Sequence, residues 1–402
     1  MTSGNLINEL RDTIQDCNIN FLIGSGLSMP YLSLLGKTER LLTELSDKKE
    51  KEEIEENLEK IIKASLYKAF FDGIISKNIN LLEGSDDEKL DEVLNNYQEF
   101  IKIINTIFLN RRNTILSKQI NLFTTNFDIF LERTLEVTSV EYNDGFSGRF
   151  NPVFNLSNFK KSFFKRTLHY DNTYELPVFN LMKIHGSLTW EKEIGEQNIY
   201  FDKHLQIVRN IKEVQISDNQ LIDIEAVEKE KLDNSRIQID HFIPCAKDKK
   251  LDENIERFIK EYEKLSIINP TKEKFKETVL NRNHYELLRI YSTELEKENT
   301  VLFVMGFSFS DEHIREVTIR VANSNPTLKI YVFAYTEKAK KNIERKIEKT
   351  RLNNDNVQII SPSDFNNNEI KDGKLKFQAI NEKVFNVLLR SIDEKEYSSY
   401  SI

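Results

Sequence analysis

The sequence predicts an α/β fold: a Rossmann-like, doubly wound parallel sheet that carries large helical insertions. Six short apolar runs are separated by helical segments along the 402 residues. These runs are rich in Val, Ile, Leu and Phe and lack clean polar alternation, as expected for parallel strands covered on both faces. The first run ends in a glycine turn that leads into a long helical stretch. This order of strand, turn and helix is typical of nucleotide-binding sheets.

The expected strands are short and end next to glycine or polar residues. They are Asn20–Ile23, Asn121–Phe123, Phe179–Ile184, Val301–Met305, Ile330–Ala334 and Val357–Ile360. Apolar residues from Leu90 to Phe108 recur at helical spacing, which predicts one amphipathic helix there. Further helices are expected at Asn283–Leu295, Thr336–Arg351 and Ala379–Ser391.

The uneven spacing of the strands predicts two insertions. A helical insertion is expected at about 36–118, and a mixed one at about 190–280. Within the second, Glu193–Phe201 is expected to form a hairpin and Gln238–Pro244 a strand. The nucleotide-binding core is then expected to span residues 1–365 and to be followed by a C-terminal extension at 366–402.

Composition and charge exclude several classes of protein. With 57 basic and 65 acidic residues the net charge is −8, so nucleic acid would have to be bound through a local patch or a partner. The only cysteines are Cys17 and Cys245, which excludes a disulfide framework and a four-cysteine zinc site, and we expect no metal. No apolar run approaches the roughly 20 residues that span a bilayer, and no signal-peptide core is visible, so we expect a cytoplasmic location.

The first candidate site is the turn Gly24-Ser25-Gly26 after the first strand. Two glycines remove Cβ atoms that would keep the backbone away from a diphosphate, and such a turn is expected to point free N–H groups at that anion. Alone this is a weak signal, because Met29 stands where the dinucleotide fingerprint has its third glycine.

Polar residues follow the second strand in Thr124-Thr125-Asn126-Phe127-Asp128. At the carboxyl end of a parallel strand these side chains can bond to ribose hydroxyls and a carboxamide. The alternative is capping of the next helix by Thr124, Thr125 or Asn126, with Asp128 favoured by the helix dipole. Spacing alone favours capping.

Two more polar segments follow buried strands. His185, in Lys183-Ile-His185-Gly186-Ser187, can accept a proton near neutral pH, although a lone histidine is more often structural. In Gly306-Phe-Ser308-Phe-Ser310-Asp311, Ser308 or Ser310 is expected to cap a helix or Ser308 to contact a ribose or phosphate. Asp311 and Glu312 would repel a phosphate at that helix start.

The motifs that are absent narrow the chemistry. The sequence has no Gly-x-Ser-x-Gly elbow, no P-loop and no carboxylate pair at a strand end. A hydrolase whose leaving group needs a general acid would require such a carboxylate. Oxidised NAD does not, because its nicotinamide is a cationic pyridinium that leaves as a neutral molecule. One histidine, one asparagine and a glycine turn suffice to bind NAD and to position a nucleophile.

Together these segments resemble the ordered motifs of the sirtuin superfamily, and their variants resemble its bacterial antiviral-defence branch. The matching segments are Gly24-Ser-Gly-Leu-Ser28, Thr125-Asn-Phe-Asp128, His185-Gly186 and Gly306-Phe-Ser308. The resemblance implies an NAD-binding core with His185 as the base and Asn126 near the nicotinamide ribose. It also implies that Asp128 contacts the carboxamide or holds its loop, and that phosphates and adenosine are lined by Gly24, Ser25, Gly26, Ser28 and Ser308.

The resemblance departs from the protein deacylases of that superfamily. Their Pro-Asp-Phe-Arg segment is replaced by Tyr31-Leu-Ser-Leu, and their zinc module is excluded by the cysteine count. We therefore expect an NAD⁺ glycohydrolase that acts in antiviral defence by depleting NAD, in a homo-oligomer and with a HerA-type ATPase as one implied partner. The alternatives are a deacylase or ADP-ribosyltransferase and a non-catalytic NAD-binding subunit.

Overall fold

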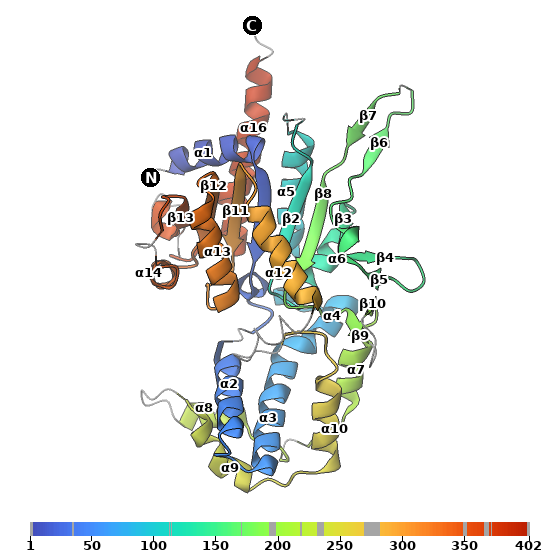
Figure 1. Cartoon of the computed structure of the whole chain (residues 1–402), viewed down its shortest axis with the longest axis vertical. Helices are drawn as coiled ribbons and strands as arrows, with labels where there is room; N and C mark the ends of the chain where they lie inside the picture. The colour runs from blue at the N-terminus through green and yellow to red at the C-terminus, as the bar shows by residue number, and fades with distance from the viewer. Residues whose placement is uncertain are drawn as a thin grey trace.

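A sheet of seven parallel strands forms the centre of the protein (Figure 1). The computed structural model describes residues 3–33, 36–111, 113, 115–169, 171–192, 198–217, 219–230, 237–268, 282–348, 352–365, 370 and 372–399. In sheet order the strands are β13 (Val357–Ile360), β12 (Leu328–Phe333), β11 (Thr300–Met305), β1 (Asn18–Ile23), β2 (Gln119–Thr124), β8 (Val178–Lys183) and β3 (Glu141–Asn143). The chain begins its sheet at β1 and adds strands on both sides, so the predicted doubly wound α/β fold is confirmed.

The sequence predicts six of these strands, each within two residues of its observed ends. The seventh, β3, has three residues and is only partly buried. The sequence Glu141-Tyr-Asn143 lacks the apolar run that marks a buried strand, and β3 pairs with β8 at the edge of the sheet.

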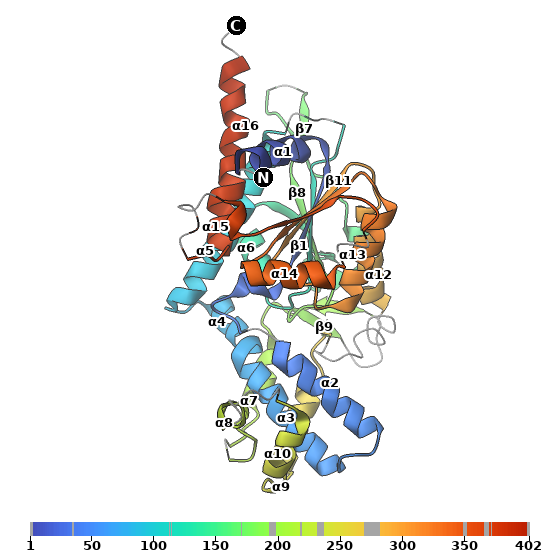
Figure 2. The same cartoon turned by 90° about the vertical axis from the view of Figure 1, so that its left-hand side faces the viewer.

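Helices cover both faces of the sheet (Figure 2). One apolar cluster joins the sheet to α1 (Ser3–Asp16), α5 (Glu88–Leu109), α6 (Phe130–Val137), α15 (Phe377–Ile380) and α16 (Asn386–Ser399). The other joins it to α12 (Arg282–Leu295), α13 (Glu312–Ser324) and α14 (Glu337–Lys346). Successive strand residues alternate between the two clusters: Phe21 belongs to the first and Leu22 to the second.

A buried row of asparagines crosses four strands on the face that α12 covers. Asn20, Asn121, Asn180 and Asn143 are aligned in the strand register. The Asn121 amide donates to Asn20 at 2.8 Å, the Asn180 amide donates to Asn121 at 3.0 Å, and the Asn143 amide donates to Asn180 at 3.0 Å. Slippage of one strand by one residue would leave these amides buried and unpaired, so the row specifies the register.

The first insertion forms most of a helical layer beyond the carboxyl end of the sheet (Figure 1). It contains α2 (Gly36–Glu50), α3 (Glu56–Phe70), a π-helical turn Phe71–Ile75 and α4 (Lys77–Glu83) before α5 returns to the sheet. The second insertion adds α7 (Gln206–Glu213), α8 (Ile224–Glu230), α9 (Ile243–Lys247) and α10 (Glu253–Tyr262).

The predicted strand at Gln238–Pro244 is wrong. Residues Ile239–His241 form a 3₁₀ turn that runs into α9. Gln238 begins the turn with a capping box, and Pro244 lies in the first turn of α9, where its missing N–H costs nothing. The buried residues Ile239, Phe242 and Ala246 recur at helical rather than strand spacing.

Two small antiparallel sheets lie beside β3 and β8. The first has the order β4 (Phe146–Ser147), β5 (Val153–Phe154), β10 (Ile199–Phe201) and β9 (Trp190–Lys192). The second is the hairpin of β6 (Phe164–Arg166) and β7 (Thr173–Glu175). The hairpin predicted at Glu193–Phe201 lies partly outside the described residues, but β10 does pair with the preceding strand β9.

The C-terminal helices pack into the core. A π-helical turn at Asn381–Phe385 joins α15 to α16. The ring of Phe385 lies 6.1 Å from that of Phe21 and 5.8 Å from that of Phe303, between ring centroids. Among the described residues, no helix combines the length and apolar character needed to cross a membrane.

Candidate functional site

The four motif segments leave the sheet from a single row. Ile23 in β1 is aligned with Thr124 in β2 and with Met305 in β11, and Thr124 is aligned with Lys183 in β8. The segments that follow these residues therefore begin at the same carboxyl edge of the sheet, where parallel α/β proteins bind their ligands.

The glycines of the first and last segments pack backbone against backbone. A Cβ atom on Gly24 would lie 2.5 Å from the Gly306 carbonyl oxygen, and one on Gly26 would lie 2.9 Å from it. Gly306 has φ +64°, and a Cβ atom there would lie 2.6 Å from the Leu27 nitrogen. All three glycines are thus required by the close approach of the two loops.

The turn Gly24-Ser25-Gly26 is expected from the sequence to point free N–H groups at an anion, but most of its N–H groups are bonded within the protein. Gly24 donates to the Met305 carbonyl at 2.9 Å, Gly26 to the Gly306 carbonyl at 3.0 Å, and Leu27 to the Gly24 carbonyl at 3.2 Å. Residues Ser25–Ser28 form a 3₁₀ turn, whose tight geometry turns these donors inward. The half-buried Ser25 remains the polar side chain of the turn with access to a ligand.

Ser28 and Asp128 meet although 100 residues separate them. The Ser28 hydroxyl donates to Asp128 Oδ2 at 2.9 Å and lies 3.3 Å from the Tyr97 hydroxyl. Asp128 Oδ1 accepts from the Phe130 N–H at 3.2 Å. Burial raises the pKa of the Asp128 carboxyl. Ser28 follows β1 and Asp128 follows β2, so their buried hydrogen bond holds these two loops together.

Asn126 is a buried polar residue of the site whose side-chain amide makes no hydrogen bond to the described residues. Its side chain is buried with 5% exposure, and neither its amide nitrogen nor its oxygen has a hydrogen-bond partner among the described residues. Tyr97 approaches this amide without forming a hydrogen bond of standard geometry. Buried polar groups are nearly always bonded, so an unpaired amide at a strand end indicates a place for a ligand.

The capping role considered for this segment is wrong for Thr124, Thr125 and Asn126. The N-cap position of α6 is Ile129, whose side chain makes no cap hydrogen bond, and the N–H of Phe130, the first residue of the helix, donates to Asp128 instead. The Thr124 hydroxyl donates to the Ile23 carbonyl at 2.9 Å and accepts from the Asn126 N–H at 3.0 Å. The Thr125 N–H donates to the same carbonyl at 3.3 Å, and its side chain is half-buried.

His185 is paired with Asp311, a residue that the sequence marks only as acidic. Its Nε2 lies 3.0 Å from Asp311 Oδ2, and the two side chains are 12% and 7% exposed. Strands β8 and β11 are separated by β1 and β2, so the loop 306–311 crosses about 14 Å at the usual strand spacing to reach His185. The contact therefore brings the segment that follows β8 together with the segment that follows β11.

Asp311, rather than Ser308 or Ser310, caps α13. Its Oδ1 accepts from the backbone N–H groups of His313 at 3.1 Å and Ile314 at 3.2 Å. A carboxylate is the stronger acceptor for these donors, which explains why the serines are displaced from the cap. Ser308 is exposed, and its hydroxyl lies 2.9 Å from that of Ser310, to which Lys346 also donates.

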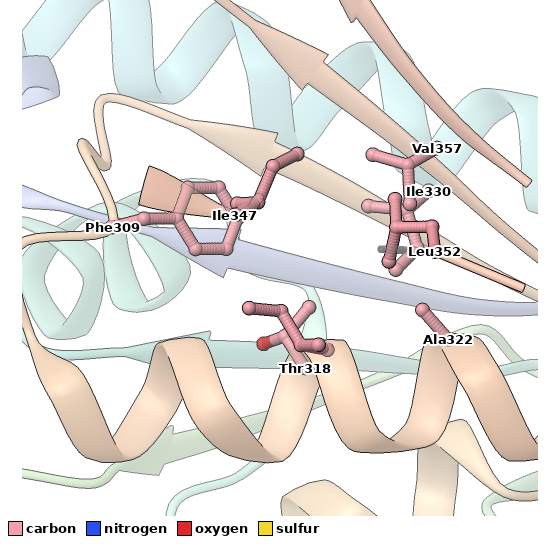
Figure 3. A pocket seen from close by; sticks show the side chains of 8 residues that line it. Phe309, Thr318, Ala322, Ile330, Ile347, Leu352 and Val357 are labelled. Atoms are coloured by element: carbon pink, nitrogen blue, oxygen red, sulfur yellow. The ribbon is translucent and has the colours of Figure 1, made fainter. Parts of the chain in front are cut away.

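Phe309 anchors the loop that carries Ser308 and Asp311. Its backbone has φ +55°, which is uncommon for a residue with a side chain, and its ring is buried. Figure 3 shows the ring at one end of a small apolar cavity of about 10 Å³. The cavity is lined by Phe309, Thr318, Ile319, Ala322, Ile330, Ile347, Leu352 and Val357. Burial of the ring therefore holds the loop in its strained conformation.

Replacing Phe309 with Ala is expected to destabilise the protein by about 3 kcal/mol, because the truncation enlarges a cavity that is already present. Loss of the anchor also frees Asp311 from His185. Urea unfolding measures the first effect. The conservative variant Phe309→Leu should recover most of the stability, and equal stability of Phe309→Ala and the wild type would contradict the anchoring role.

Gly186 places the second insertion against His185. It has φ +81°, and a Cβ atom there would lie 2.1 Å from the Ser266 carbonyl oxygen. Ile268 donates its N–H to the His185 carbonyl at 2.9 Å, and Ile267 forms a β-bridge with Gly186. The first insertion also reaches the site, because Asn78 in α4 accepts from the Ile129 N–H at 3.0 Å. Both insertions thus support loops of the site.

His284 is a second, buried histidine beside His185. It donates from Nδ1 to the Ile184 carbonyl at 2.8 Å and stacks on Trp190. Burial lowers the pKa of His284 from 6.5 to about 4. This imidazole therefore stays neutral at physiological pH and supports the strand end that carries His185.

We expect the free energy of unfolding to fall between pH 6.5 and pH 4, in part through His284. In this interval the unfolded chain binds a proton at this imidazole and the folded chain does not, a loss of up to about 3 kcal/mol. Burial raises the pKa of Asp144 to about 6, which acts with the opposite sign. Urea unfolding of His284→Asn, which keeps a donor, isolates the contribution. An unchanged pH profile in this variant would contradict it.

A buried ion pair lies behind the site. Lys183 Nζ is 2.8 Å from Glu132 Oε1 and also donates to the Asp128 carbonyl, and the Ser187 hydroxyl donates to Glu132 at 2.8 Å. These contacts tie α6 to the segments before and after His185. Their charges compensate each other in a buried position.

Sequence reasoning missed several of these supporting residues. Tyr97 belongs to the apolar stripe of α5, a pattern that indicates a core residue. Asn78 and His284 lie in helices that are distant in sequence from the motifs they support. Lys183 is the last residue of a buried strand, and a buried lysine requires a partner. The sequence could therefore have indicated an ion pair at this position. Among the described residues, no cluster of three or more His, Cys, Asp or Glu side chains is placed to hold a metal ion.

The comparisons with known proteins support a sirtuin relationship. Residues 258–360 match the family described as SIR2-like domain. This segment includes β11, the Gly306–Asp311 loop, β12 and β13, and it does not include Asn126 or His185. No curated protein matches the chain. SIR2-like domains bind NAD and are usually NAD-dependent enzymes. Residues 258–360 are thus similar to part of a SIR2-like domain, which supports a relationship with the sirtuin-like superfamily.

Proposed function

We propose that this protein is an NAD⁺ glycohydrolase, which converts NAD⁺ and water into nicotinamide and ADP-ribose. The observation that carries the proposal is the buried amide of Asn126, which lacks hydrogen-bond partners among the described residues. Asn126 follows β2, and His185 follows the neighbouring strand β8 at the same edge of the sheet. A neutral ribose hydroxyl or a water molecule is the kind of group that an amide oxygen and nitrogen bind together.

His185 is proposed as the base. Asp311 Oδ2 lies 3.0 Å from Nε2 of His185, and a carboxylate can only accept hydrogen bonds, so we propose that the imidazole carries its proton on Nε2 and uses Nδ1 as the proton acceptor. When NAD⁺ is bound, a water oxygen forms a bond to C1′ of the nicotinamide ribose while the bond from C1′ to the ring nitrogen breaks. The electron pair of that bond neutralises the pyridinium, and His185 takes the proton of the water.

The other predicted ligand residues divide into two groups. Ser25, Thr125 and Ser308 have at least partly accessible side chains and are proposed to contact the dinucleotide, with Ser308 on the adenosine side. The remaining residues hold the loops: the glycines by permitting close backbone contact, and the buried pair Ser28 and Asp128 by joining them. No metal is proposed for the reaction.

Chromatography of an NAD⁺ reaction tests the proposal. We expect equal amounts of nicotinamide and ADP-ribose with the wild type and a loss of roughly 100-fold or more in rate with His185→Ala. Labelled ADP-ribose or a removed acyl group on protein would instead support a transferase or deacylase. Thermal stabilisation by NAD⁺ without nicotinamide release would support a non-catalytic subunit.

The cellular role is proposed from the resemblance of the motifs to the antiviral-defence branch. An NAD⁺ glycohydrolase without control would harm its host, so we propose that assembly or a partner, such as a HerA-type ATPase, governs activity. The contacts of both insertions with the site loops, from Asn78 to Ile129 and from Ile267 to Gly186, provide a route. A purified monomer with full activity and no further component would contradict this regulation.

A further inference from the structure

Tyr97 is a buried tyrosine whose hydroxyl reaches the loops of the candidate site. It lies in α5, at the end of the first insertion, and is fully buried. Its hydroxyl is 3.3 Å from that of Ser28 and also lies close to the Asn126 amide. The proposed hydrolysis does not use this group. Tyr97 nevertheless connects the loop that follows β1 with the loop that follows β2.

Two neighbouring helices fix the position of the Tyr97 hydroxyl. The Tyr97 ring stacks on Phe130 of α6, with 5.4 Å between the ring centroids and 14° between the planes. It also forms a T-shaped contact with Phe377 of α15, at a centroid distance of 5.0 Å. Both helices lie beside α5 (Figure 2). Rotation of the ring would break both contacts, so the hydroxyl stays directed at the site.

The order of donors determines what Tyr97 can offer to Asn126. Burial raises the pKa of Tyr97 well above its ordinary value of 10, so the hydroxyl keeps its hydrogen at physiological pH. The Ser28 hydroxyl donates its own hydrogen to Asp128 Oδ2 at 2.9 Å, so toward Tyr97 it can only accept. Tyr97 therefore spends its one hydrogen on Ser28, and its oxygen is left as an acceptor.

An amide nitrogen is the group that complements this acceptor. Neither Nδ2 nor Oδ1 of Asn126 has a hydrogen-bond partner among the described residues. Half a turn of the amide exchanges the two atoms, and only their hydrogen-bond partners distinguish the two arrangements. If Oδ1 faced Tyr97, two acceptors would meet in a buried position. The Tyr97 oxygen thus favours the arrangement in which Nδ2 faces α5 and Oδ1 faces away from it.

We propose that Tyr97 is a positioning residue for Asn126. When the dinucleotide binds, the Tyr97 oxygen accepts from Asn126 Nδ2, and Oδ1 is left to accept from a ribose hydroxyl or from water. The inference rests on the proposed role of Asn126 as a ligand-binding residue. An amide held in one arrangement loses less freedom on binding than an amide that rotates, so removal of the hydroxyl should weaken binding.

A double-mutant cycle tests the proposal with ADP-ribose as the probe, so that no turnover is needed. Calorimetry gives the dissociation constant for the wild type, Tyr97→Phe, Asn126→Leu and the double variant. We expect Tyr97→Phe to weaken binding by roughly tenfold, about the value of one hydrogen bond, when Asn126 is present. In the Asn126→Leu background the same change should have no effect, because the group that Tyr97 positions is missing.

Ser28→Ala tests the direction of the hydrogen bonds. Without its acceptor, the Tyr97 hydrogen is free to turn to Asn126 Oδ1, which reverses the amide. We therefore expect Ser28→Ala to weaken ADP-ribose binding when Asn126 is present and not in the Asn126→Leu background. Unchanged affinity of Ser28→Ala would overturn the proposal, since Tyr97 would then donate to Asn126 in the wild type as well.

Tyr291→Phe is the matched control. Tyr291 is also fully buried, and its hydroxyl lies 2.8 Å from that of Thr318, between α12 and α13. This variant should lose stability in urea unfolding but keep the affinity of the wild type for ADP-ribose. Circular dichroism checks that each variant is folded. Equal weakening by Tyr97→Phe in both Asn126 backgrounds would indicate a structural role alone and would overturn the inference.

The same measurements separate this inference from the proposed function. Coupling between Tyr97 and Asn126 in a protein that releases no nicotinamide would support the positioning role and overturn only the NAD⁺ glycohydrolase. Nicotinamide release by the wild type without such coupling would overturn only the positioning role. A wild type that binds neither ADP-ribose nor NAD⁺ would overturn both.

Discussion

Replacing Asn126 with Leu is expected to abolish nicotinamide release while making the folded protein more stable by about 1 kcal/mol. The amide is buried without partners, so its desolvation is uncompensated in the free protein, and a leucine of similar volume removes that cost. The amide is proposed to act only when NAD⁺ is bound. Nicotinamide release and urea unfolding of the same preparations measure the two effects.

Asn180→Leu is the matched control, because Asn180 is equally buried but fully bonded. Its amide donates to Gln119 at 2.7 Å and to Asn121 at 3.0 Å. Its loss should destabilise the protein by about 3 kcal/mol, since it leaves several buried polar groups unpaired. Activity per folded molecule should change little. If Asn126→Leu were as destabilising as Asn180→Leu, the amide would have a structural rather than a ligand-binding role.

Gly186→Ala is expected to cost about 3–5 kcal/mol of stability and most of the activity. Its Cβ atom would lie 2.1 Å from the Ser266 carbonyl oxygen, and the residue would keep a positive φ of 81°. The backbone must shift to relieve this contact, and His185 is the adjacent residue. Thermal unfolding and nicotinamide release measure both losses.

Gly373→Ala separates the steric contact from the backbone conformation. Gly373 also has a positive φ, 63°, but a Cβ atom there would meet nothing within 4 Å. We expect a cost of about 1 kcal/mol, from the left-handed conformation alone. Equal losses in the two variants would contradict the view that the second insertion is packed against the His185 segment.

The sheet was predictable because its strands carry a local signal. Runs such as Val301–Met305 are apolar throughout, and only a strand buried on both faces requires that pattern. The edge strand Glu141–Asn143 and the turn that begins α9 depend on neighbours far along the chain, so local patterns fail there. The division into a core of 1–365 and an extension of 366–402 stays a prediction, as does a cytoplasmic location.

The candidate site was predictable as a list of segments but not as a set of contacts. Parallel strand ends share one edge, so the positions of Asn126 and His185 follow from topology. The pairing of His185 with Asp311 depends on a loop that crosses two strands, and no spacing in the sequence encodes it. The role of the glycines beside a phosphate stays a prediction, and the contact that their Cβ atoms would make with the protein backbone is one that a sequence pattern does not reveal.

A crystal structure of the His185→Ala variant grown with NAD⁺ shows directly whether Asn126 and His185 face one bound cofactor. The variant should retain intact NAD⁺, because the proposed base is missing. We expect the nicotinamide ribose to lie between residues 126 and 185, with the Asn126 amide bonded to the ribose or to a water beside C1′. NAD⁺ bound elsewhere, with that amide still unpaired, would contradict the proposed roles of Asn126 and His185.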